Sequence, residues 1–344
     1  MKSISVFPAA VRVGLLALVA AGCEANHHHD HHGHGAHSAN ASASPGALPS
    51  ASSHSASVAF SPDGNRLVGA LPPASSSAIA SANTDGVFTP EPPATPQQDS
   101  GAGVGYDKTP VIPGQKWRVH DKDRPVPPIV APGARFSHGA PPPSDATVLF
   151  GGQDLSKWEL PDGKPAPWTL RNGFFQVAPK TGSIQTRQEF GDCQLHIEFA
   201  TPSAVEGSSQ GRGNSGIFFH ADFEVQVLDS YNNRTYADGQ VGALYGQWPP
   251  LANPVKGPGE WNSYDIVFEA PRFDTAGKLS RPGFLTVILN GVLMHNRKEL
   301  NGPTHHQVVD PYKPYNSRGK ISLQDHGNQT RFRNIWVRAI GEYN

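Results

Sequence analysis

Period-two alternation in short segments is the feature that most constrains how this chain folds. From Cys193 to Phe199, apolar residues hold the odd positions and polar residues the even ones, which is the pattern of a half-buried β-strand. Phe284 to Leu289 and Val292 to Met294 flank the pair Asn290-Gly291. Because Asn-Gly suits the two positive-φ positions of a tight turn, these residues predict a β-hairpin.

Further short segments carry the same signal, and glycine, proline or asparagine separates most of them. They are Gly216 to His220, Phe223 to Leu228, Ser263 to Phe268, Lys320 to Gln324 and Ile335 to Ala339. No long segment has the 3.6-residue period of an amphipathic helix, so an α/β enzyme fold is disfavoured. The pattern predicts an all-β, jelly-roll-type sandwich over residues 144–340.

The N-terminus predicts export. Lys2 and Arg12 precede an apolar run, Val13 to Ala21, that is too short for a permanent membrane-spanning helix and is typical of a signal peptide. Small residues stand directly before Cys23, as in a bacterial lipoprotein. We expect residues 1–23 to be a lipoprotein-type signal peptide and Cys23 to be lipidated, anchoring the chain at a membrane that faces the periplasm or the cell surface. An ordinary signal peptide with an incidental cysteine is the alternative.

Residues 24–143 differ in composition from the rest of the chain. A His-rich tract at 27–34 is followed by a Ser/Ala/Pro-rich stretch that has too little apolar surface to offset its ordering entropy. We interpret 24–143 as a mostly disordered tether, with Thr109 to Pro132 extended along the domain surface. The His-rich tract either captures a transition metal or is a solvated low-complexity segment.

Charge and cysteine content narrow the possible partners. The formal net charge is -1 and no Lys/Arg stripe is present, so nucleic acid is not an expected partner and a neutral ligand is. Contact with a membrane is expected only through the lipid anchor. Cys193 is the only cysteine besides Cys23, so lipidation of Cys23 leaves no intrachain disulfide.

The strand from Phe223 to Asp229 carries the most informative polar residues. Glu224 and Gln226 share one face of this strand, and Asp229 joins them only if a bulge follows Gln226. This spacing superficially resembles the acidic motif of jelly-roll endoglucanases. Gln226 stands where that motif has an acid, which weakens the comparison.

Other polar motifs surround this strand in the sequence. They combine amides, aromatic rings and a few charges, the groups that pair with sugar hydroxyls and stack on sugar rings. They include Asn214 in a glycine-rich approach to a strand, Tyr245, the run Gln324-Asp325-His326, and Arg333. The sequence therefore predicts a carbohydrate ligand.

A set of motifs in this order resembles the 3-keto-disaccharide hydrolase domain family, and the resemblance covers about 190 residues. The motifs are Leu149 to Trp158, Gly213 to Gly216, Glu224 to Ser230, Trp261 to Tyr264, Leu323 to Gly327, and Arg333 to Ile335. The resemblance implies a concanavalin A-like jelly roll in a planctomycete-type lipoprotein. It also implies an enzyme that cleaves glycosides previously oxidised at C3 of the sugar.

The chemistry of such a substrate suggests roles for the candidates. A ketone at C3 acidifies the hydrogen on C2, so a base can remove it and the enolate can expel the C1 substituent before water adds. Glu224 and His326 are the candidate acid–base residues, and Asp229 or Asp325 is a candidate to orient the histidine. Asn214, Gln226 and Arg333 are candidate donors to the C3 oxygen, for which a divalent ion is an alternative. Further candidates for substrate binding are Tyr245, Gln324 and Asp325.

Simpler structural interpretations compete with these roles. Glu224 and Gln226 can face solvent on an exposed sheet, His326 can be a turn residue, and Arg333 can fix a strand end. Trp158, Trp168 and Trp261 are expected in the core rather than at a sugar-binding surface. For the domain as a whole, the alternatives are a lectin-like module without catalysis and a conventional glycosidase that pairs Glu224 with Asp229.

Overall fold

The computed structural model describes residues 104–341. The predicted signal peptide with Cys23, the His-rich tract and the rest of the predicted tether up to residue 103 lie outside the described residues. Within 104–341, no helix has the length and apolar character needed to cross a membrane.

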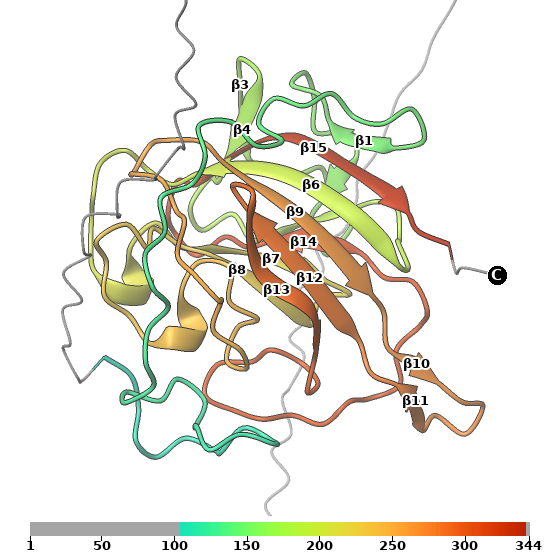
Figure 1. Cartoon of the computed structure of the whole chain (residues 1–344). Helices are drawn as coiled ribbons and strands as arrows, with labels where there is room; N and C mark the ends of the chain where they lie inside the picture. Colours follow the sequence, from blue (N-terminus) through green and yellow to red (C-terminus); the bar gives the residue numbers. More distant parts are fainter. Residues whose placement is uncertain (1–103, 342–344) are drawn as a thin grey trace, which may run out of the picture. The chain divides into compact units, whose positions relative to one another are not determined.

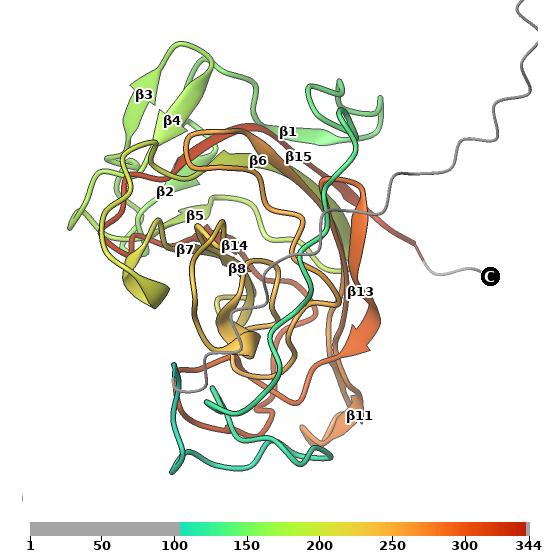
Figure 2. The same ribbon diagram turned by 60° about the vertical axis from the view of Figure 1, so that its left-hand side comes forward.

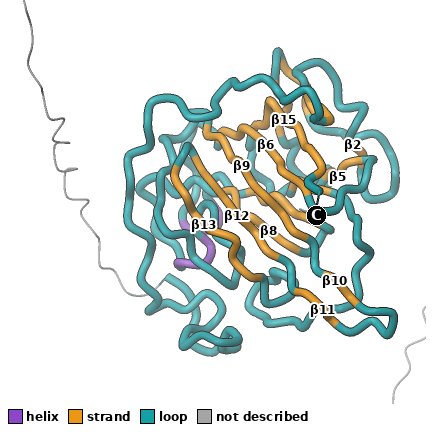
Figure 3. Tube along the Cα trace, turned by 45° about the vertical axis from the view of Figure 1, so that its right-hand side comes forward, coloured by secondary structure: helices purple, strands orange, loops and turns teal. Residues whose placement is uncertain are grey.

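The described residues form β-strands with two short 3-10 helices, η1 (Ser209–Gly211) and η2 (Ala237–Gly239). Figure 3 shows strands and loops almost throughout. The strands are β1 (Thr147–Phe150), β2 (Trp158–Glu159), β3 (Thr169–Arg171), β4 (Phe174–Gln176), β5 (Ile184–Thr186), β6 (Cys193–Ala200), β7 (Ser215–Phe219), β8 (Phe223–Val227), β9 (Asn262–Glu269), β10 (Arg272–Phe273), β11 (Leu279–Arg281), β12 (Phe284–Leu289), β13 (Val292–Glu299), β14 (Ile321–Leu323) and β15 (Arg331–Ala339).

Two antiparallel sheets build the domain. The large sheet has eight strands in the order β13-β12-β9-β6-β15-β4-β3, with β1 beside β15, and the small sheet has five in the order β2-β5-β14-β7-β8. A two-stranded ribbon, β10-β11, extends from the large sheet (Figure 1). The large sheet curves around the small one (Figure 2). This arrangement confirms the predicted all-β jelly-roll sandwich.

The core lies between the two sheets because each strand turns its apolar face inward. Leu195, Ile197 and Phe199 of β6 face Ile217 and Val225 of the small sheet across one continuous apolar cluster. Trp158 and Trp168 belong to this core, as expected. Trp261 does not: it packs outside the core against the guanidinium of Arg333, 4.1 Å from its ring centroid.

The predicted hairpin is confirmed. β12 and β13 are joined by Asn290 at φ 50° and Gly291 at φ 81°, the positive values that an Asn-Gly turn requires. The alternation in β6 is confirmed too, but its polar face is not open to solvent, since His196 and Glu198 are fully buried.

A short segment that we name the clasp, residues 136–140, covers this polar face of the large sheet. Glu198 accepts hydrogen bonds from the backbone N–H of Gly139 (2.6 Å) and from Arg333 Nε (2.7 Å). Asn334 bridges the two sides, donating to Glu198 (3.0 Å) and to the carbonyl of Ala140 (3.0 Å). Backbone groups of the clasp thereby provide hydrogen bonds that water would otherwise make to the polar side chains of this face.

Residues 104–143 differ from the disordered tether that their composition predicted. Ile112, Val119 and His120 in this stretch are buried, and a backbone hydrogen bond of 2.9 Å joins Ile112 to Trp117. A few apolar side chains are sufficient because the sandwich offers them a surface that the sequence of the stretch does not reveal. The stretch runs from the loops at the bottom of Figure 1 up to β1. Between residues 109 and 124 it forms turns, with a bridge between Val111 and Arg118, rather than the extended surface segment that was predicted.

Candidate active site

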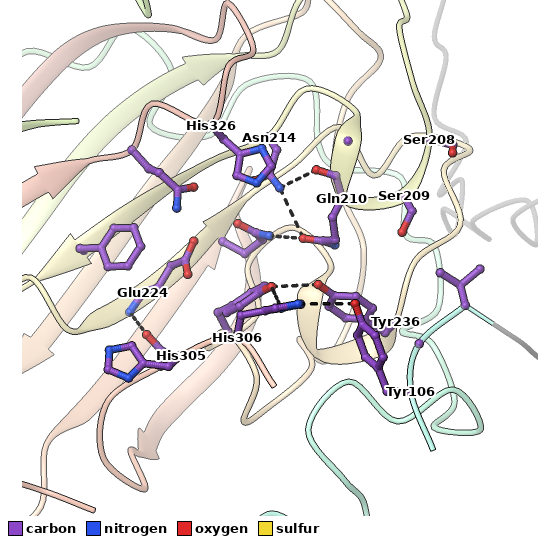
Figure 4. Close-up of a pocket in the computed structure, with 18 residues that line it drawn as sticks. Tyr106, Ser208, Ser209, Gln210, Asn214, Glu224, Tyr236, His305, His306 and His326 are labelled. Atoms are coloured by element: carbon purple, nitrogen blue, oxygen red, sulfur yellow. Dashed lines mark hydrogen bonds between the residues drawn. The ribbon is translucent and has the colours of Figure 1, made fainter. Parts of the chain in front are cut away.

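A pocket lies on the face of the small sheet that points away from the core. Its volume is about 710 Å³, within the range of roughly 300–1,000 Å³ usual for sites that take drug-sized ligands. Six predicted site residues line it, and Figure 4 shows their surroundings. These six residues are Asn214, Glu224, Gln226, Tyr245, Gln324 and His326.

Glu224 is the central ionisable group of the pocket. β8 turns its even-numbered side chains outward, so Glu224 and Gln226 project together, as predicted from their spacing. Glu224 is only 5% exposed, and none of the ion pairs within residues 104–341 includes it. Burial without a compensating cation raises the pKa of its carboxyl to about 8. Glu224 therefore carries a proton at neutral pH.

Hydrogen bonds fix the backbone at Glu224, and the neighbouring strand leaves room for its carboxyl. Its N–H donates to Thr304 Oγ1 (2.8 Å), and that hydroxyl donates in turn to the carbonyl of Asp222 (2.9 Å). On the neighbouring strand β7, a Cβ added to Gly216 would lie 2.3 Å from the carboxyl oxygen of Glu224. Only glycine at position 216 leaves that space free.

Two amide side chains present oxygens without partners to the same pocket. Asn214 donates its NH₂ to the carbonyl of Gln210 (2.7 Å), and Gln226 donates its own to Gln210 Oε1 (2.8 Å). The oxygens Asn214 Oδ1 and Gln226 Oε1 are buried and have no hydrogen-bond partner. This differs from the prediction that both amides donate to a substrate carbonyl, because Gln210 already takes their N–H groups. The two oxygens instead suit hydroxyl donors of a ligand.

His326 stands at the exposed rim of the pocket, on the loop after β14. Desolvation by the surrounding protein lowers the pKa of its imidazole below the ordinary value. It is therefore neutral at neutral pH and able to accept a proton. The pocket thus pairs a protonated carboxyl with a neutral imidazole, two groups whose pKa values are shifted in opposite directions.

Four aromatic residues line the pocket on the side that faces His326 and Asn214. We name this group the aromatic wall, and its members are Tyr106, Tyr236, Tyr245 and His306. Their polar atoms are linked in a row. The hydroxyls of Tyr236 and Tyr245 are 2.8 Å apart, Tyr245 lies 3.0 Å from His306 Nδ1, and Tyr106 lies 3.4 Å from His306 Nε2. Burial raises the pKa of both Tyr236 and Tyr245, so their hydroxyls stay protonated.

The structure does not bring Asp229 into the pocket. β8 ends at Val227 and pairs with β7 in regular register, without the bulge that the prediction required. Asp229 instead accepts a hydrogen bond from Arg212 Nε (2.7 Å) and one from the backbone N–H of Tyr231 (3.2 Å). Its position excludes a direct acid–base role beside Glu224.

Asp325 and Arg333 also lie outside the pocket lining. The carboxylate of Asp325 accepts hydrogen bonds from the backbone N–H groups of Thr181 (3.0 Å) and Gly182 (3.1 Å). Asp325 thus fixes the loop that carries His326 and does not orient the imidazole of His326, as one alternative had predicted. Arg333 belongs to β15 of the large sheet and pairs with Glu198 beneath the clasp. The motifs with His326 and Arg333 are close in sequence but far from each other's sites, because β14 belongs to the small sheet and β15 to the large one.

Several lining residues were not singled out from the sequence. Gln210 and Tyr236 stand close in sequence to the predicted residues Asn214 and Tyr245, and their amide and hydroxyl were the available signal. Thr304 and His306 lie in a segment without regular secondary structure, and Tyr106 lies in the predicted tether. No pattern in those segments indicated contact with the pocket.

No cluster suited to a metal ion is found among residues 104–341, where no three His, Cys, Asp or Glu side chains gather in a suitable way. The divalent-ion alternative stays a prediction. The His-rich tract, for which metal capture was considered, is outside the described residues.

Comparison with known proteins places this pocket in a family context. The sequence profile of the 3-keto-alpha-glucoside-1,2-lyase-like domain matches residues 145–338. A 3-keto-disaccharide hydrolase from Bacteroides thetaiotaomicron is 22% identical over 245 residues, covering 56% of this chain and 78% of the relative.

A solved structure agrees with this assignment. A protein from Parabacteroides distasonis ATCC 8503, described as a candidate glycosyl hydrolase, is 47% identical with a TM-score of 0.57, over 63% of this chain and 93% of that one. These matches support a glycosyl hydrolase-like function with a carbohydrate substrate. Since the profile covers more than half of its length, the chain belongs to the 3-keto-alpha-glucoside-1,2-lyase-like domain family.

Proposed function

We propose that this protein cleaves the glycosidic bond of 3-keto-glycosides by removing the C2 proton, eliminating the C1 substituent and then adding water. The observation that carries the proposal is the buried, uncompensated carboxyl of Glu224 in a pocket that also holds neutral His326. The family and the names of the relatives support the class of substrate.

The first step is proton abstraction. His326 takes the hydrogen from C2, and the electron pair of that C–H bond forms a C2–C3 double bond while negative charge develops on the C3 oxygen. Glu224, protonated because its pKa is raised to about 8, donates a hydrogen bond to this oxygen. The free amide oxygens of Asn214 and Gln226 accept hydrogen bonds from sugar hydroxyls and hold the ring in place.

The second step breaks the glycosidic bond. The enolate pair returns to re-form the C3 carbonyl, a C1–C2 double bond forms, and the C1–O bond breaks. The proton held on His326 passes to the departing oxygen. Water then adds across the double bond, with its oxygen on C1 and a proton on C2, which gives the free 3-keto sugar.

Two other functions make different predictions. A conventional glycosidase needs two carboxyl groups on either side of the scissile bond, and Asp229 is not in the pocket to serve as the second. A lectin-like module needs no ionisable group at its binding surface, whereas keeping Glu224 buried and unpaired costs stability. Both comparisons favour an acid–base enzyme.

The test is to incubate the full chain with 3-keto-trehalose and a 3-keto-β-glucoside beside the unoxidised sugars, and to follow products by mass spectrometry. We expect product from the keto sugars alone. Product from the unoxidised sugars would support a conventional glycosidase, and binding without turnover a lectin-like module.

Site variants test the roles of the two side chains. Glu224→Ala removes the donor to the C3 oxygen and His326→Ala removes the base, so each should lower kcat by at least about a hundredfold. Glu206→Gln is the matched control, because Glu206 is exposed and outside the pocket lining. Full activity of either site variant would refute the role given to that residue.

We also propose that the mature chain is an exported lipoprotein attached through Cys23. The small residues before this cysteine support the proposal. In cells, Cys23→Ser should abolish incorporation of labelled palmitate and release the protein from the membrane fraction. A variant that still incorporates the label would show that Cys23 is not the attachment site.

A further inference from the structure

Gln210 contacts both of the pocket amides whose oxygens have no partner. It lies in η1, ahead of β7, and lines the pocket. Asn214 donates to the backbone carbonyl of Gln210 (2.7 Å), and Gln226 donates to its side-chain oxygen Oε1 (2.8 Å). Figure 4 shows the dashed lines between Asn214 and Gln210. One residue therefore contacts two amides that come from different strands or strand ends.

The side chain of Gln210 is itself held in one orientation. Its NH₂ group donates to Thr235 Oγ1 (2.8 Å) and to the carbonyl of Gly239 (2.9 Å). A carbonyl oxygen only accepts, so the end of the amide that faces Gly239 is the NH₂ group. Thr235 is buried, and its hydroxyl also accepts a hydrogen bond from Ser209 Oγ (2.8 Å). These contacts turn Gln210 Oε1 toward Gln226.

The orientation of Gln210 in turn determines that of Gln226. Gln210 Oε1 and the carbonyl of Gly239, 3.4 Å away, can only accept, so Gln226 presents its NH₂ group to them. The oxygen at the other end of this amide, Gln226 Oε1, is buried and has no partner. Turning the amide over would place two oxygens against each other. The side chain of Gln210 thus fixes Gln226 as an acceptor for a ligand.

Asn214 is oriented by the backbone of Gln210 rather than by its side chain. The carbonyl that accepts from Asn214 is present whatever side chain stands at position 210. The distance from Asn214 Nδ2 to Gln210 Oε1 is longer, at 3.5 Å. Asn214 Oδ1 is buried without a partner, as Gln226 Oε1 is. A change in the side chain of Gln210 therefore affects one of the two acceptors and leaves the other in place.

Two buried acceptors without donors are costly unless a ligand supplies the donors. A hydroxyl can donate to such an oxygen, whereas a hydrogen on carbon or an O-methyl group cannot. A site built to bind a hydroxyl discriminates strongly against an analogue that lacks it, because the protein group is then left unpaired. A 3-keto-glucoside has hydroxyls at C2, C4 and C6 that can fill this role.

We propose that Gln210 is a positioning residue that makes Gln226 a hydrogen-bond acceptor, and that Gln226 and Asn214 select keto sugars with two free hydroxyls. The inference rests on the proposed function and adds a feature of the substrate. Sugars that are deoxygenated or alkylated at either of the two hydroxyls are poor substrates.

The test compares a 4-nitrophenyl 3-keto-glucoside with its 2-deoxy, 4-deoxy and 6-deoxy analogues, in the wild type and in Gln210→Met. Methionine is similar in length to glutamine but has no NH₂ group and no carbonyl oxygen, so it removes the orienting contacts and fills the space. Discrimination is the kcat/KM of the parent divided by that of an analogue. The intrinsic reactivity of each analogue is the same for both proteins, so a change in discrimination reports a contact with the protein.

In Gln210→Met, discrimination against one analogue should fall about fivefold or more, and discrimination against the other two should stay as in the wild type. Gln226→Met removes the acceptor itself and should lose discrimination against the same analogue. The double variant should lose no more than either single variant, because both act on one contact. Asn214→Ala should lose discrimination against a different analogue.

Gln188→Met is the matched control, since Gln188 is exposed and does not line the pocket. It should leave every ratio unchanged. An equal loss of kcat/KM for all four substrates in Gln210→Met would show a merely structural role and overturn the inference, as would discrimination that does not change at all. If the wild type cleaves none of the four substrates, the proposed function itself is overturned.

Discussion

Glu224 is a buried acid that gains a proton on folding, and this has a consequence for stability. Its pKa is raised from 4.5 to about 8, so between these values the folded state binds more protons than the unfolded state. The free energy of unfolding therefore falls as pH rises through this window.

Glu224→Gln tests this linkage, because glutamine does not titrate. Relative to wild type, the variant should gain on the order of 3–5 kcal/mol in the free energy of unfolding between pH 5 and pH 9. Urea unfolding at a series of pH values measures the difference. Parallel pH profiles of the two proteins would show that Glu224 is not desolvated as described.

The same residue predicts a feature of the pH–rate profile. Turnover should decline above about pH 8, as Glu224 loses the proton through which it hydrogen-bonds to the C3 oxygen. It should also decline at acidic pH, where His326 becomes protonated, with a midpoint below the ordinary histidine value because its pKa is lowered. A rate that rises continuously through pH 8 to 9 would instead indicate that ionised Glu224 is the base.

At the scale of single residues, the sequence predicted what depends on local periodicity. Glu224 and Gln226 share a face because they are two positions apart on one strand, and both line the pocket. Asp229 required a bulge that no local pattern specifies. The roles of Asn214 and Gln226 as acceptors were also not predictable, since they depend on Gln210 taking their N–H groups.

Among the structural elements, the hairpin of β12 and β13 is the one that its sequence determines most directly. The turn uses two positive φ angles, and the glycine also makes room for another element: a Cβ on Gly291 would lie 2.7 Å from Phe136 Cγ. The turn thus contacts the clasp as well as closing the hairpin.

Gly291→Ala should lower the free energy of unfolding by about 1–2 kcal/mol, through strain at positive φ and displacement of Phe136. Thermal or urea denaturation measures the loss. Gly163→Ala is a suitable reference, because Gly163 has φ +83° with open space around it and so reports the strain alone. Equal losses in the two variants would show that Phe136 is not displaced.

The prediction of elements succeeded for the long strands and failed for residues 104–124, which were predicted to be disordered. β6, β9 and β12 have strong alternation, whereas residues 104–124 are held by a few apolar side chains and by the pair of His120 with Asp238. The composition of a segment shows how much apolar surface the segment itself contains. It does not show whether other segments supply a surface on which that segment can pack, which is what orders residues 104–124.

Within residues 104–341, chain that precedes β1 contacts the outer face of each sheet. The clasp covers polar residues of the large sheet, while Val104, Gly105 and Tyr106 line the pocket on the small sheet. Which of the two sheets receives each strand was not predictable from the sequence, because that choice rests on long-range pairing. Arg333 illustrates this, since its strand β15 enters the large sheet and carries it away from the pocket.

The clasp predicts how the molecule responds to acid. Burial opposes ionisation of Glu198, but hydrogen bonds from His196, Asn334, Gly139 and Arg333 prevail and hold its pKa well below the usual range. Its contribution to stability is present above the unfolded-state pKa near 4.5 and is lost as pH falls below that value.

Glu198→Ala should therefore lower the free energy of unfolding at pH 7 by about 3–5 kcal/mol, since it leaves Arg333 and the clasp without their shared partner. The loss should shrink as pH falls toward 2. Denaturation at pH 7 and at pH 3 measures both effects. Glu206→Gln serves again as the surface control, and an equal loss at the two pH values would contradict the assignment.

The absence of a side chain at Gly216 constrains how strands β7 and β8 can evolve. The carboxyl of Glu224 occupies the volume in which any larger residue at 216 would place its first side-chain carbon. No single substitution at 216 preserves the position of that carboxyl, so the two positions are expected to change together or not at all. Homologues that lack the acid can fill the space, and those that keep it should keep the glycine, which makes this pair a marker for members of the family that retain the chemistry.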